Sequence, residues 1–146
     1  MRVVVERATM HDVDDVKRLL AVNRLPLDGL IDHMHTAFVA RQDGRVVGSA
    51  ALEVYADGAL LRSVAVASPS RGEGLGHVLT EVAIRYAADH SLPALYLLTT
   101  TAERFFAKLG FERIGREDVP ASVQASIEFT SACPASAIVM RKLMTR

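Results

Sequence analysis

The pattern of apolar residues at the start of the chain predicts a strand followed by a helix. Val3–Arg7 is rich in β-branched residues and predicts a strand. Thr9, with Asp12 three residues later, is typical of a capped helix start. Apolar residues then recur at helical spacing, which predicts one buried helix face made of Val13, Val16, Leu19 and Leu20.

The middle of the chain predicts an antiparallel pair of strands and a third strand after it. The expected elements are a short helix over 28–35 and strands over 37–41, 46–55 and 60–67. Asp43-Gly44, which joins the first two strands, is a dipeptide favoured in tight hairpin turns. Asp57-Gly58 precedes the third strand and Ser68-Pro69 follows it, which is typical of strand boundaries.

At Leu75 the apolar period changes from that of a strand to that of a helix. The positions expected to face inward are Leu75, Val78, Leu79, Val82, Ala83, Tyr86 and Ala87. Pro93 then precedes a short apolar strand over 94–98. A strand, a helix and a strand of this length imply a parallel pair with a right-handed crossover.

The C-terminal third predicts a short helix and two more strands. Thr100 and Glu103 fit a capping box for a helix that ends at Leu109, and Gly110 suits a left-handed helix end. Strands are expected over 111–116 and 137–143, with a long loop over 117–136. Loops of this length in compact domains are often functional. The fold class is therefore α/β (α+β), with a mixed sheet.

Length and charge narrow the classes of function. With 146 residues, 50% of them hydrophobic, the chain can bury one substantial core, so we expect a single domain over 1–146. Seventeen basic residues balance 17 acidic ones, which argues against nucleic acid or an anionic membrane as the main partner. We expect neither a secretory signal nor a membrane span, because no apolar run has the required length.

Cysteine and histidine usage predicts no metal site. Cys133 is the only cysteine, so it cannot form an internal disulfide or a cysteine-rich site. The five histidines show no convincing ligand spacing. A reducing cytoplasm is the expected location.

The strongest chemical signal is a glycine-rich turn between an expected strand and an expected helix. It consists of Arg71, Gly72, Glu73, Gly74, Leu75 and Gly76. Backbone N–H groups at the positive end of a helix dipole predict a phosphate site, and Arg71 adds charge. The dinucleotide pattern G-x-G-x-x-G fails at His77, and the Walker sequence is absent. Taken alone, the turn can also be a helix start that binds nothing.

Two ordered motifs resemble the GNAT acetyltransferase superfamily. Arg71, Gly74 and Gly76 match the cofactor signature R/Q-x-x-G-x-G/A, and the 102–111 segment is similar to A-x-x-F-Y-x-x-x-G-F. The resemblance implies a mainly antiparallel sheet of about six to seven strands with a central parallel pair and about four helices. The 60–66, 95–102 and 133–136 segments look like a narrower group, the arsenic-resistance N-acetyltransferases, which resemble the acetyltransferase domain of N-acetylglutamate synthase.

The resemblance implies acetyl-CoA as co-substrate. It places the pantetheine arm against Val64, Ala65 and Val66, the pyrophosphate in the 71–76 turn, and further cofactor contacts at Phe105 and Phe106. Phe106 occupies the position where many members carry an acidic tyrosine. The departing thiolate therefore leaves unprotonated, is protonated through water, or takes a proton from another donor.

Polar residues near the expected parallel strands are candidates for catalysis. Thr99, with Thr100 and Thr101, can donate a proton or cap the next helix. Glu53, late in its strand, is either a general base or a solvated glutamate at a strand end.

Arg62 is the residue that gives the most information about the chemical class of the acceptor. Strand alternation places it on the same face as Leu60, Val64 and Val66, and a buried guanidinium needs an anionic partner. That partner is either internal, Glu53 or Glu128, or it is the carboxylate of the acceptor, with Arg62 and Glu128 as acceptor-binding residues.

An acceptor carboxylate agrees with the narrower resemblance. That resemblance implies acetylation of an amino acid or of a toxic glutamate-like analogue, such as phosphinothricin or its arsenical counterpart. Cys133 can contact arsenic in such a substrate or serve as a small buried hydrophobe.

Three functions remain open from the sequence. The first is a small-molecule N-acetyltransferase, which the long 117–136 loop favours because it suits a cover over a small acceptor. The second is a protein or peptide N-acetyltransferase, and the third is a non-catalytic acyl-CoA-binding module. Pairing of an exposed edge strand near the C-terminus offers a route to a homodimer.

Overall fold

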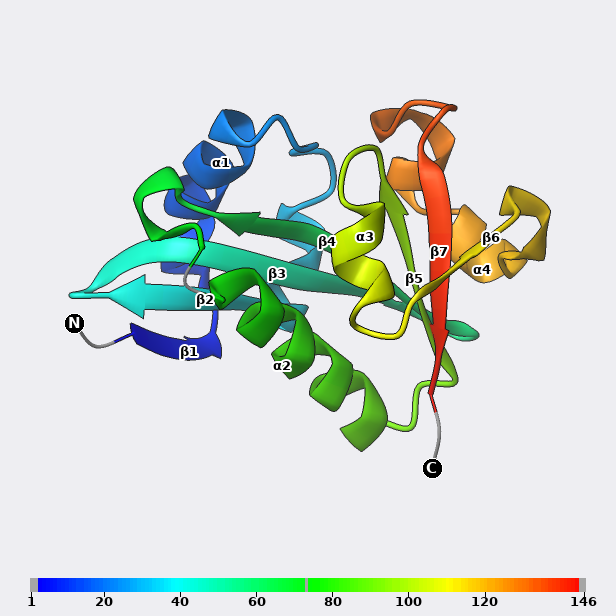
Figure 1. Cartoon of the computed structure of the whole chain (residues 1–146), viewed down its shortest axis with the longest axis horizontal. Helices are drawn as coiled ribbons and strands as arrows, with labels where there is room; N and C mark the ends of the chain where they lie inside the picture. The colour runs from blue at the N-terminus through cyan, green and yellow to red at the C-terminus, as the bar shows by residue number, and fades with distance from the viewer. Residues whose placement is uncertain (1–2, 73, 145–146) are drawn as a thin grey trace.

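The computed structural model describes residues 3–72 and 74–144, so Glu73 of the glycine-rich turn lies outside the described residues. Seven strands form one sheet in the order β1-β2-β3-β4-β5-β7-β6 (Figure 1). The strands are β1 (Val3–Arg7), β2 (Ala37–Gln42), β3 (Arg45–Tyr55), β4 (Gly58–Val66), β5 (Ala94–Thr99), β6 (Glu112–Ile114) and β7 (Ile138–Leu143). The α-helices are α1 (Val13–Val22), α2 (Leu75–Asp89), α3 (Glu103–Ala107) and α4 (Ala121–Gln124).

Short turns of tighter or wider helix complete the described chain. The 3₁₀ turns are η1 (Met10–Asp12), η2 (Ile31–Thr36), η3 (Ser68–Ser70) and η4 (Arg116–Asp118), and η5 (Glu128–Ala132) is a π-helical turn. Within the described ranges, no helix is long and apolar enough to cross a membrane.

The sheet is mixed, as the sequence predicts. Strands β4 and β5 are parallel and are joined through α2, whereas every other neighbouring pair is antiparallel. The mixed sheet with one central parallel pair and flanking helices confirms the predicted fold class. The strand at the C-terminal edge is β6, because β7 lies between β5 and β6.

The two long helices pack on opposite faces of this sheet. The Thr9 backbone N–H donates to Asp12 Oδ2 at 2.8 Å, so the predicted capping box precedes α1. The predicted inward residues of α1 are all buried. In α2, however, Val78 is 43% exposed, whereas Thr80 is fully buried and donates to the Gly76 carbonyl at 2.8 Å. The apolar face of α2 is thus wider than the part that packs on the sheet, and the prediction that Val78 faces inward is wrong.

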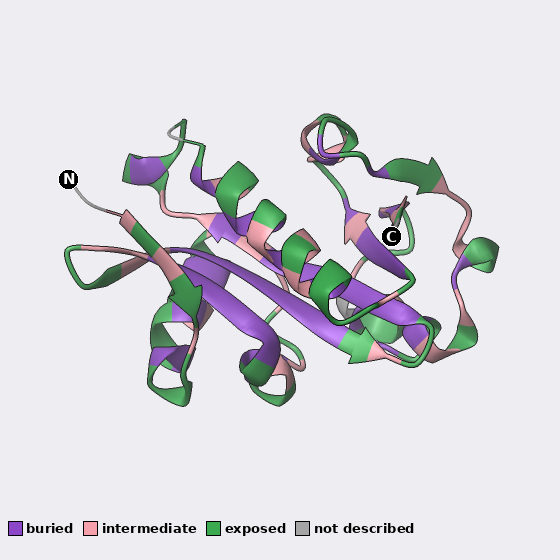
Figure 2. Cartoon of the chain, turned by 90° about the horizontal axis from the view of Figure 1, so that it is seen from below, coloured by how far each residue is buried: buried purple, intermediate pink, exposed green. Residues whose placement is uncertain are grey.

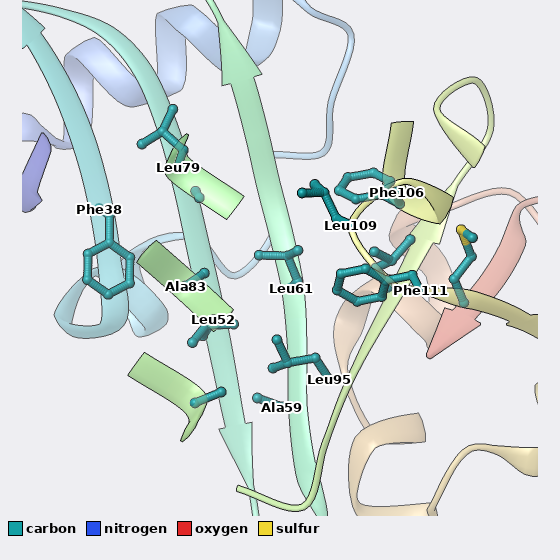
Figure 3. Close-up of a cluster of buried hydrophobic side chains, with 14 of the residues drawn as sticks. Phe38, Leu52, Ala59, Leu61, Leu79, Ala83, Leu95, Phe106, Leu109 and Phe111 are labelled. Carbon is teal, nitrogen blue, oxygen red and sulfur yellow. The ribbon is translucent and has the colours of Figure 1, made fainter. Parts of the chain in front are cut away.

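Three groups of buried side chains hold the layers together. The largest joins α2, α3 and one face of the central strands (Figure 3). A second joins α1 to the opposite face of β2 and β3, and a third packs Val119 and Val123 against β4, β5 and β7. The long central strands are buried along most of their length (Figure 2).

Three local expectations are corrected by tertiary contacts. The helix expected over 28–35 is the 3₁₀ turn Ile31–Thr36. Thr100 forms no capping box, because α3 begins after Ala102, whose N–H donates to Thr99 Oγ1 at 3.0 Å. The segment 117–136 is not a plain loop, since it contains α4 and η5, which cover the cluster around Val123.

A bulge in β4 changes which side chains share a face. Ala51 lies opposite Arg62 and Ser49 lies opposite Ala65, so Ser63 and Val64 together oppose one residue of β3. Ser63 has φ +59°, a left-handed conformation that is unusual for a residue with a Cβ. Val64 and Val66 therefore pack with the α2 cluster, and the prediction that they share a face with Arg62 is wrong.

The contact of α2 with the sheet leaves no room for a side chain at Gly48 of β3. A Cβ built there meets Leu79 Cδ1 at 2.7 Å and the Ala65 carbonyl oxygen at 3.3 Å. We expect Gly48→Ala to lower the free energy of unfolding by about 1–3 kcal/mol, because the fully buried Leu79 side chain or the helix that carries it must shift. Chemical denaturation measures this change. Gly115→Ala is the control, since its Cβ meets only the mobile end of Glu117, and an equal loss in both variants would contradict the packing argument.

Candidate functional site

The parallel strands β4 and β5 separate soon after they pair. Only Ala59 with Leu95 and Leu60 with Tyr96 are in register, after which the two strands diverge (Figure 1). The bulge at Ser63 lies in the part of β4 that pairs with β3 but not with β5. There the Ser49 hydroxyl donates to the Ser63 carbonyl at 2.7 Å. The edge of β4 that faces β5 is therefore left available to a ligand between the strands.

A cavity of about 770 Å³ occupies this gap. Its walls come from β4, β5, α3, the 23–26 segment after α1, the start of α2, and the segment around η5. The predicted site residues that line it are Arg62, Val64, Ala65, Val66, Arg71, Gly76, Thr99, Phe105, Phe106 and Glu128. Gly72, Gly74, Leu75 and Glu53 are not among the lining residues. The structure thus gathers most of the predicted residues around one space.

The glycine-rich turn has the backbone geometry that a close approach of a ligand needs. Gly72 and Gly74 have φ of +86° and +79°, and a Cβ built at either meets nothing within 4 Å. Gly74 is the N-cap of α2 and offers no side-chain cap. At Gly76 a Cβ lies 3.3 Å from the Phe105 ring, so glycine there permits helix and aromatic side chain to pack closely.

The two phenylalanines of the second motif are structural as well as cavity-lining. Their rings meet edge to face with centroids 5.0 Å apart, and Phe106 packs in the same way on Phe111 at 5.8 Å. Phe106 is buried and has no hydroxyl to donate. Thr99 also lines the cavity and carries a hydroxyl. Its Oγ1 accepts a hydrogen bond from the Ala102 N–H, so its own O–H is available to donate one.

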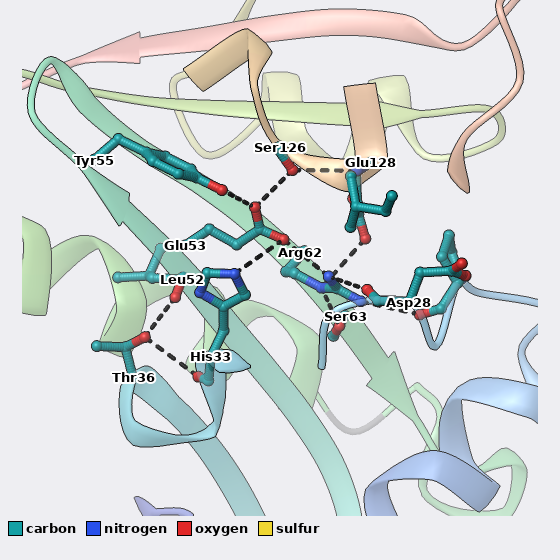
Figure 4. A network of polar contacts seen from close by, with 12 residues as sticks. Asp28, His33, Thr36, Leu52, Glu53, Tyr55, Arg62, Ser63, Ser126 and Glu128 are labelled. Carbon is teal, nitrogen blue, oxygen red and sulfur yellow. Dashed lines mark hydrogen bonds and ion pairs between the residues drawn. The ribbon is translucent and has the colours of Figure 1, made fainter. Parts of the chain in front are cut away.

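Where β4 and η5 form the cavity wall, the Arg62 guanidinium is buried between two carboxylates, those of Glu53 and Glu128 (Figure 4). Its Nη1 lies 2.8 Å from Glu53 Oε2, and its Nε lies 3.2 Å from Glu128 Oε2. Nη1 also donates to the Asp28 carbonyl at 2.6 Å, and Nη2 to the Pro26 carbonyl at 3.2 Å. Both internal ion pairs considered from the sequence are formed.

Glu53 is fully occupied by neighbours. Its Oε1 accepts hydrogen bonds from the Tyr55 hydroxyl at 2.5 Å and the Ser126 hydroxyl at 2.6 Å. Burial acts to raise the pKa of Glu53, but the hydrogen bonds from Ser126, Tyr55 and Arg62 outweigh it and hold the pKa below its ordinary value. His33 Nε2 lies 3.8 Å from Glu53 Oε2, and burial lowers the pKa of His33. Glu53 is thus a buried, ionised counter-ion of Arg62.

Glu128 has a different environment although it contacts the same arginine. Burial raises its pKa to about 7, and the attraction of Arg62 offsets this only in part. Among the described residues, the remaining carboxylate oxygen, Oε1, accepts only the weak S–H of Cys133, 3.8 Å away. Burial and the neighbouring Glu128 raise the pKa of Cys133 to about 12, so its sulfur is a thiol. Glu128 therefore presents to the cavity a carboxyl group that both gains and loses a proton near neutral pH.

Several residues of the site carry no signal in the sequence. Asn23 and Arg24 line the cavity, and Ser126 and Tyr55 fix Glu53. They belong to a helix end, a strand end and a short turn, and only the fold brings them to Arg62. Within the described part of the chain, no group of three or more His, Cys, Asp or Glu side chains is arranged to hold a metal ion.

Comparison with known proteins agrees with this geometry. Residues 33–113 match the acetyltransferase (GNAT) domain family. An amino-acid acetyltransferase of Mycobacterium tuberculosis is 33% identical over 132 residues, covering 84% of this chain and 75% of that protein.

Solved structures show the same fold. Rv2747 from Mycobacterium tuberculosis, in complex with CoA and NLQ, has a TM-score of 0.83 and 28% identity, covering 97% of this chain and 99% of that chain. N-acetylglutamate synthase from Neisseria gonorrhoeae, complexed with coenzyme A and N-acetyl-glutamate, has a TM-score of 0.85 and 21% identity. It covers 100% of this chain, which spans only 36% of the synthase chain.

The family match, the relatives and the cavity agree on one class of enzyme. The match includes β4, the glycine-rich turn, α2, β5 and α3, which together form most of the cavity wall. The predicted resemblance to the GNAT superfamily and the predicted acyltransferase activity with CoA are thereby confirmed. The chain belongs to the GNAT family of acetyltransferases.

Proposed function

We propose that this domain transfers the acetyl group of acetyl-CoA to the amine of a small acceptor that also carries a carboxylate. Amino acids and toxic glutamate-like analogues, including phosphinothricin and its arsenical counterpart, form this class. The observation that carries the proposal is that one cavity is lined by a carboxyl group, Glu128, and by arginines, which complement an ammonium and a carboxylate. The amino-acid acetyltransferase relative supports it.

The residues of the glycine-rich end fit a CoA molecule. The open space in front of Gly72 and Gly74 admits phosphate oxygens to the start of α2, and Arg71 lines the cavity beside it. The unpaired edge of β4 at Val64 to Val66 supplies backbone groups for an amide-containing arm. When bound, acetyl-CoA supplies a thioester-activated acetyl group.

Gly74→Asp tests this donor site. An aspartate at φ +79° places a negative charge at the start of α2, so we expect CoA affinity to fall about tenfold or more. Calorimetric titration with CoA measures the change. Gly44→Asp is a matched control, because Gly44 has φ +80° and open space but lies in the β2–β3 turn outside the cavity wall. Equal affinities of both variants for CoA would rule out the turn as the phosphate site.

Glu128, rather than Glu53, takes the proton of the acceptor amine in this proposal. Glu53 does not line the cavity, and its oxygens are held by Arg62, Tyr55 and Ser126. Glu128 lines the cavity and has one oxygen with only a thiol partner. Arg62 positions Glu128 through the Nε contact. The Thr99 hydroxyl donates a hydrogen bond to the departing CoA thiolate, which leaves unprotonated or takes its proton from water, because a threonine hydroxyl is a weaker acid than a thiol.

The acceptor class is tested by CoA release. Purified protein with acetyl-CoA is expected to release CoA with members of a panel of amino acids, phosphinothricin and arsenical analogues. Peptides with free N-termini or lysines form the second arm, and Gly74→Asp is the control for donor-dependent signal. Turnover confined to peptides would replace the proposal with a protein acetyltransferase, and no turnover in either arm would end it.

The role of Glu128 predicts a specific pH dependence. A base with a pKa of about 7 is protonated and inactive below that value, so kcat/KM should rise with pH and level off above about 7. Glu128→Gln should lower kcat by about 10²–10⁴-fold and remove this inflection. Initial rates across pH measure both. A variant with the wild-type rate and profile would show that Glu128 is not the base.

A cytoplasmic location and a homodimer stay predictions from the sequence. The three-residue β6, rather than β7, is the strand that a dimer at the C-terminal edge would pair through.

A further inference from the structure

One of the three arginines that line the cavity has no protein partner among the described residues. Arg24, Arg62 and Arg71 line the cavity together with one acid, Glu128. Arg62 is neutralised by Glu53, and Arg71 donates to Asn23 Oδ1 at 2.5 Å and to the Val66 carbonyl at 3.2 Å. Among the described residues, none forms a hydrogen bond or an ion pair with the Arg24 guanidinium.

Arg62 itself has little capacity left for a ligand. Its Nε–H is shared by Ser63 and Glu128. Its two Nη1–H groups donate to Asp28 and Glu53, and one Nη2–H donates to Pro26. Of its five N–H donors, one remains. A bidentate contact with an acceptor carboxylate would therefore break existing bonds, so the carboxylate needs another cation.

The backbone of Arg24 is held in an unfavourable conformation. It has φ +58° at the end of α1, where glycine or asparagine fits at lower cost. Two hydrogen bonds fix this turn, from Arg24 N to the Ala21 carbonyl at 3.1 Å and from Leu25 N to the Leu20 carbonyl at 2.9 Å. Strained backbone positions cluster at functional sites, and the Arg24 side chain is exposed, so its charge is free to meet a ligand in the cavity that it lines.

The position of Arg24 lies between the two ends of the site. Asn23, its neighbour on one side, is bound by Arg71 of the donor turn. Pro26, two residues on, is bound by Arg62 of the Arg62–Glu128 pair. The 23–26 segment is thus anchored by two arginines, and Arg24, which lies between the two anchored residues in sequence, lines the same cavity.

We infer that Arg24 binds the carboxylate of the acceptor and so determines the preference for acids over neutral amines. The inference rests on the proposed function and adds to it the residue that recognises the carboxylate. Arg24 supplies the positive charge, and Glu128 the negative one, so an α-amino acid is held by both of its charged groups.

Arg24→Asn tests the inference with little risk to the fold, because asparagine adopts the left-handed conformation readily. Calorimetric titration of the CoA-bound protein compares the amino acid of highest affinity with its α-carboxamide. The wild type is expected to prefer the acid. In Arg24→Asn, affinity for the acid should fall about tenfold or more, whereas affinity for the carboxamide and for CoA should not change.

Two controls separate strain and charge from recognition. Ser91→Asn changes a residue with φ +56° at the end of α2, away from the cavity wall, and tests the relief of strain alone. Arg85→Gln removes an exposed charge from α2. Both should bind acid and carboxamide as the wild type does.

The outcomes distinguish this inference from the proposed function. An undiminished acid preference in Arg24→Asn overturns the inference, as does a loss confined to CoA, which would place Arg24 on a donor phosphate. Acid binding that depends on Arg24 without CoA release supports the inference and ends the proposed function. If the wild type binds neither acid nor carboxamide, both fail.

Discussion

The buried guanidinium of Arg62 is the constraint on which the rest of the site depends. It joins β4 to Glu53 of β3, to Glu128 of η5, and to two carbonyls of the segment before η2. Loss of one partner of a buried ion pair costs about 3–5 kcal/mol, because the remaining charge stays out of water. Segments distant in sequence are therefore held around one cavity wall by a single side chain.

The β4 bulge and Arg62 act together. Ser63 adopts its left-handed conformation directly after Arg62, and its hydroxyl accepts a hydrogen bond from Arg62 Nε at 3.0 Å. The extra residue turns Val64 and Val66 to the α2 face while Arg62 stays on the other. Beyond Leu60 the strand is unpaired toward β5. One local irregularity thus separates the charged part of the cavity around Arg62 from its apolar wall.

The two carboxylates around Arg62 show how packing gives the same residue type different chemistry. Glu53 accepts hydrogen bonds from Tyr55, Ser126 and Arg62, which stabilise its ionised form. Glu128 has fewer hydrogen-bond partners to offset its burial, so its pKa is raised to about 7. Attraction to Arg62 is shared between them, and hydrogen bonds from neutral groups decide which one retains a proton at neutral pH.

Local chemistry made the fold and the glycine-rich turn predictable from the sequence alone. The Thr9 capping box, the inward face of α1, the Gly-rich turn and the Phe105–Phe111 segment depend on residues close in sequence, whose spacing fixes backbone geometry. The sequence also determined that Arg62 needs an anion. Which anion it has, which face Val64 presents and which residues line the cavity beside Arg62 were decided only by the tertiary structure. A β-bulge and contacts from η5 and the 23–26 segment set these features, because burial and ion pairing are properties of segments brought together by folding.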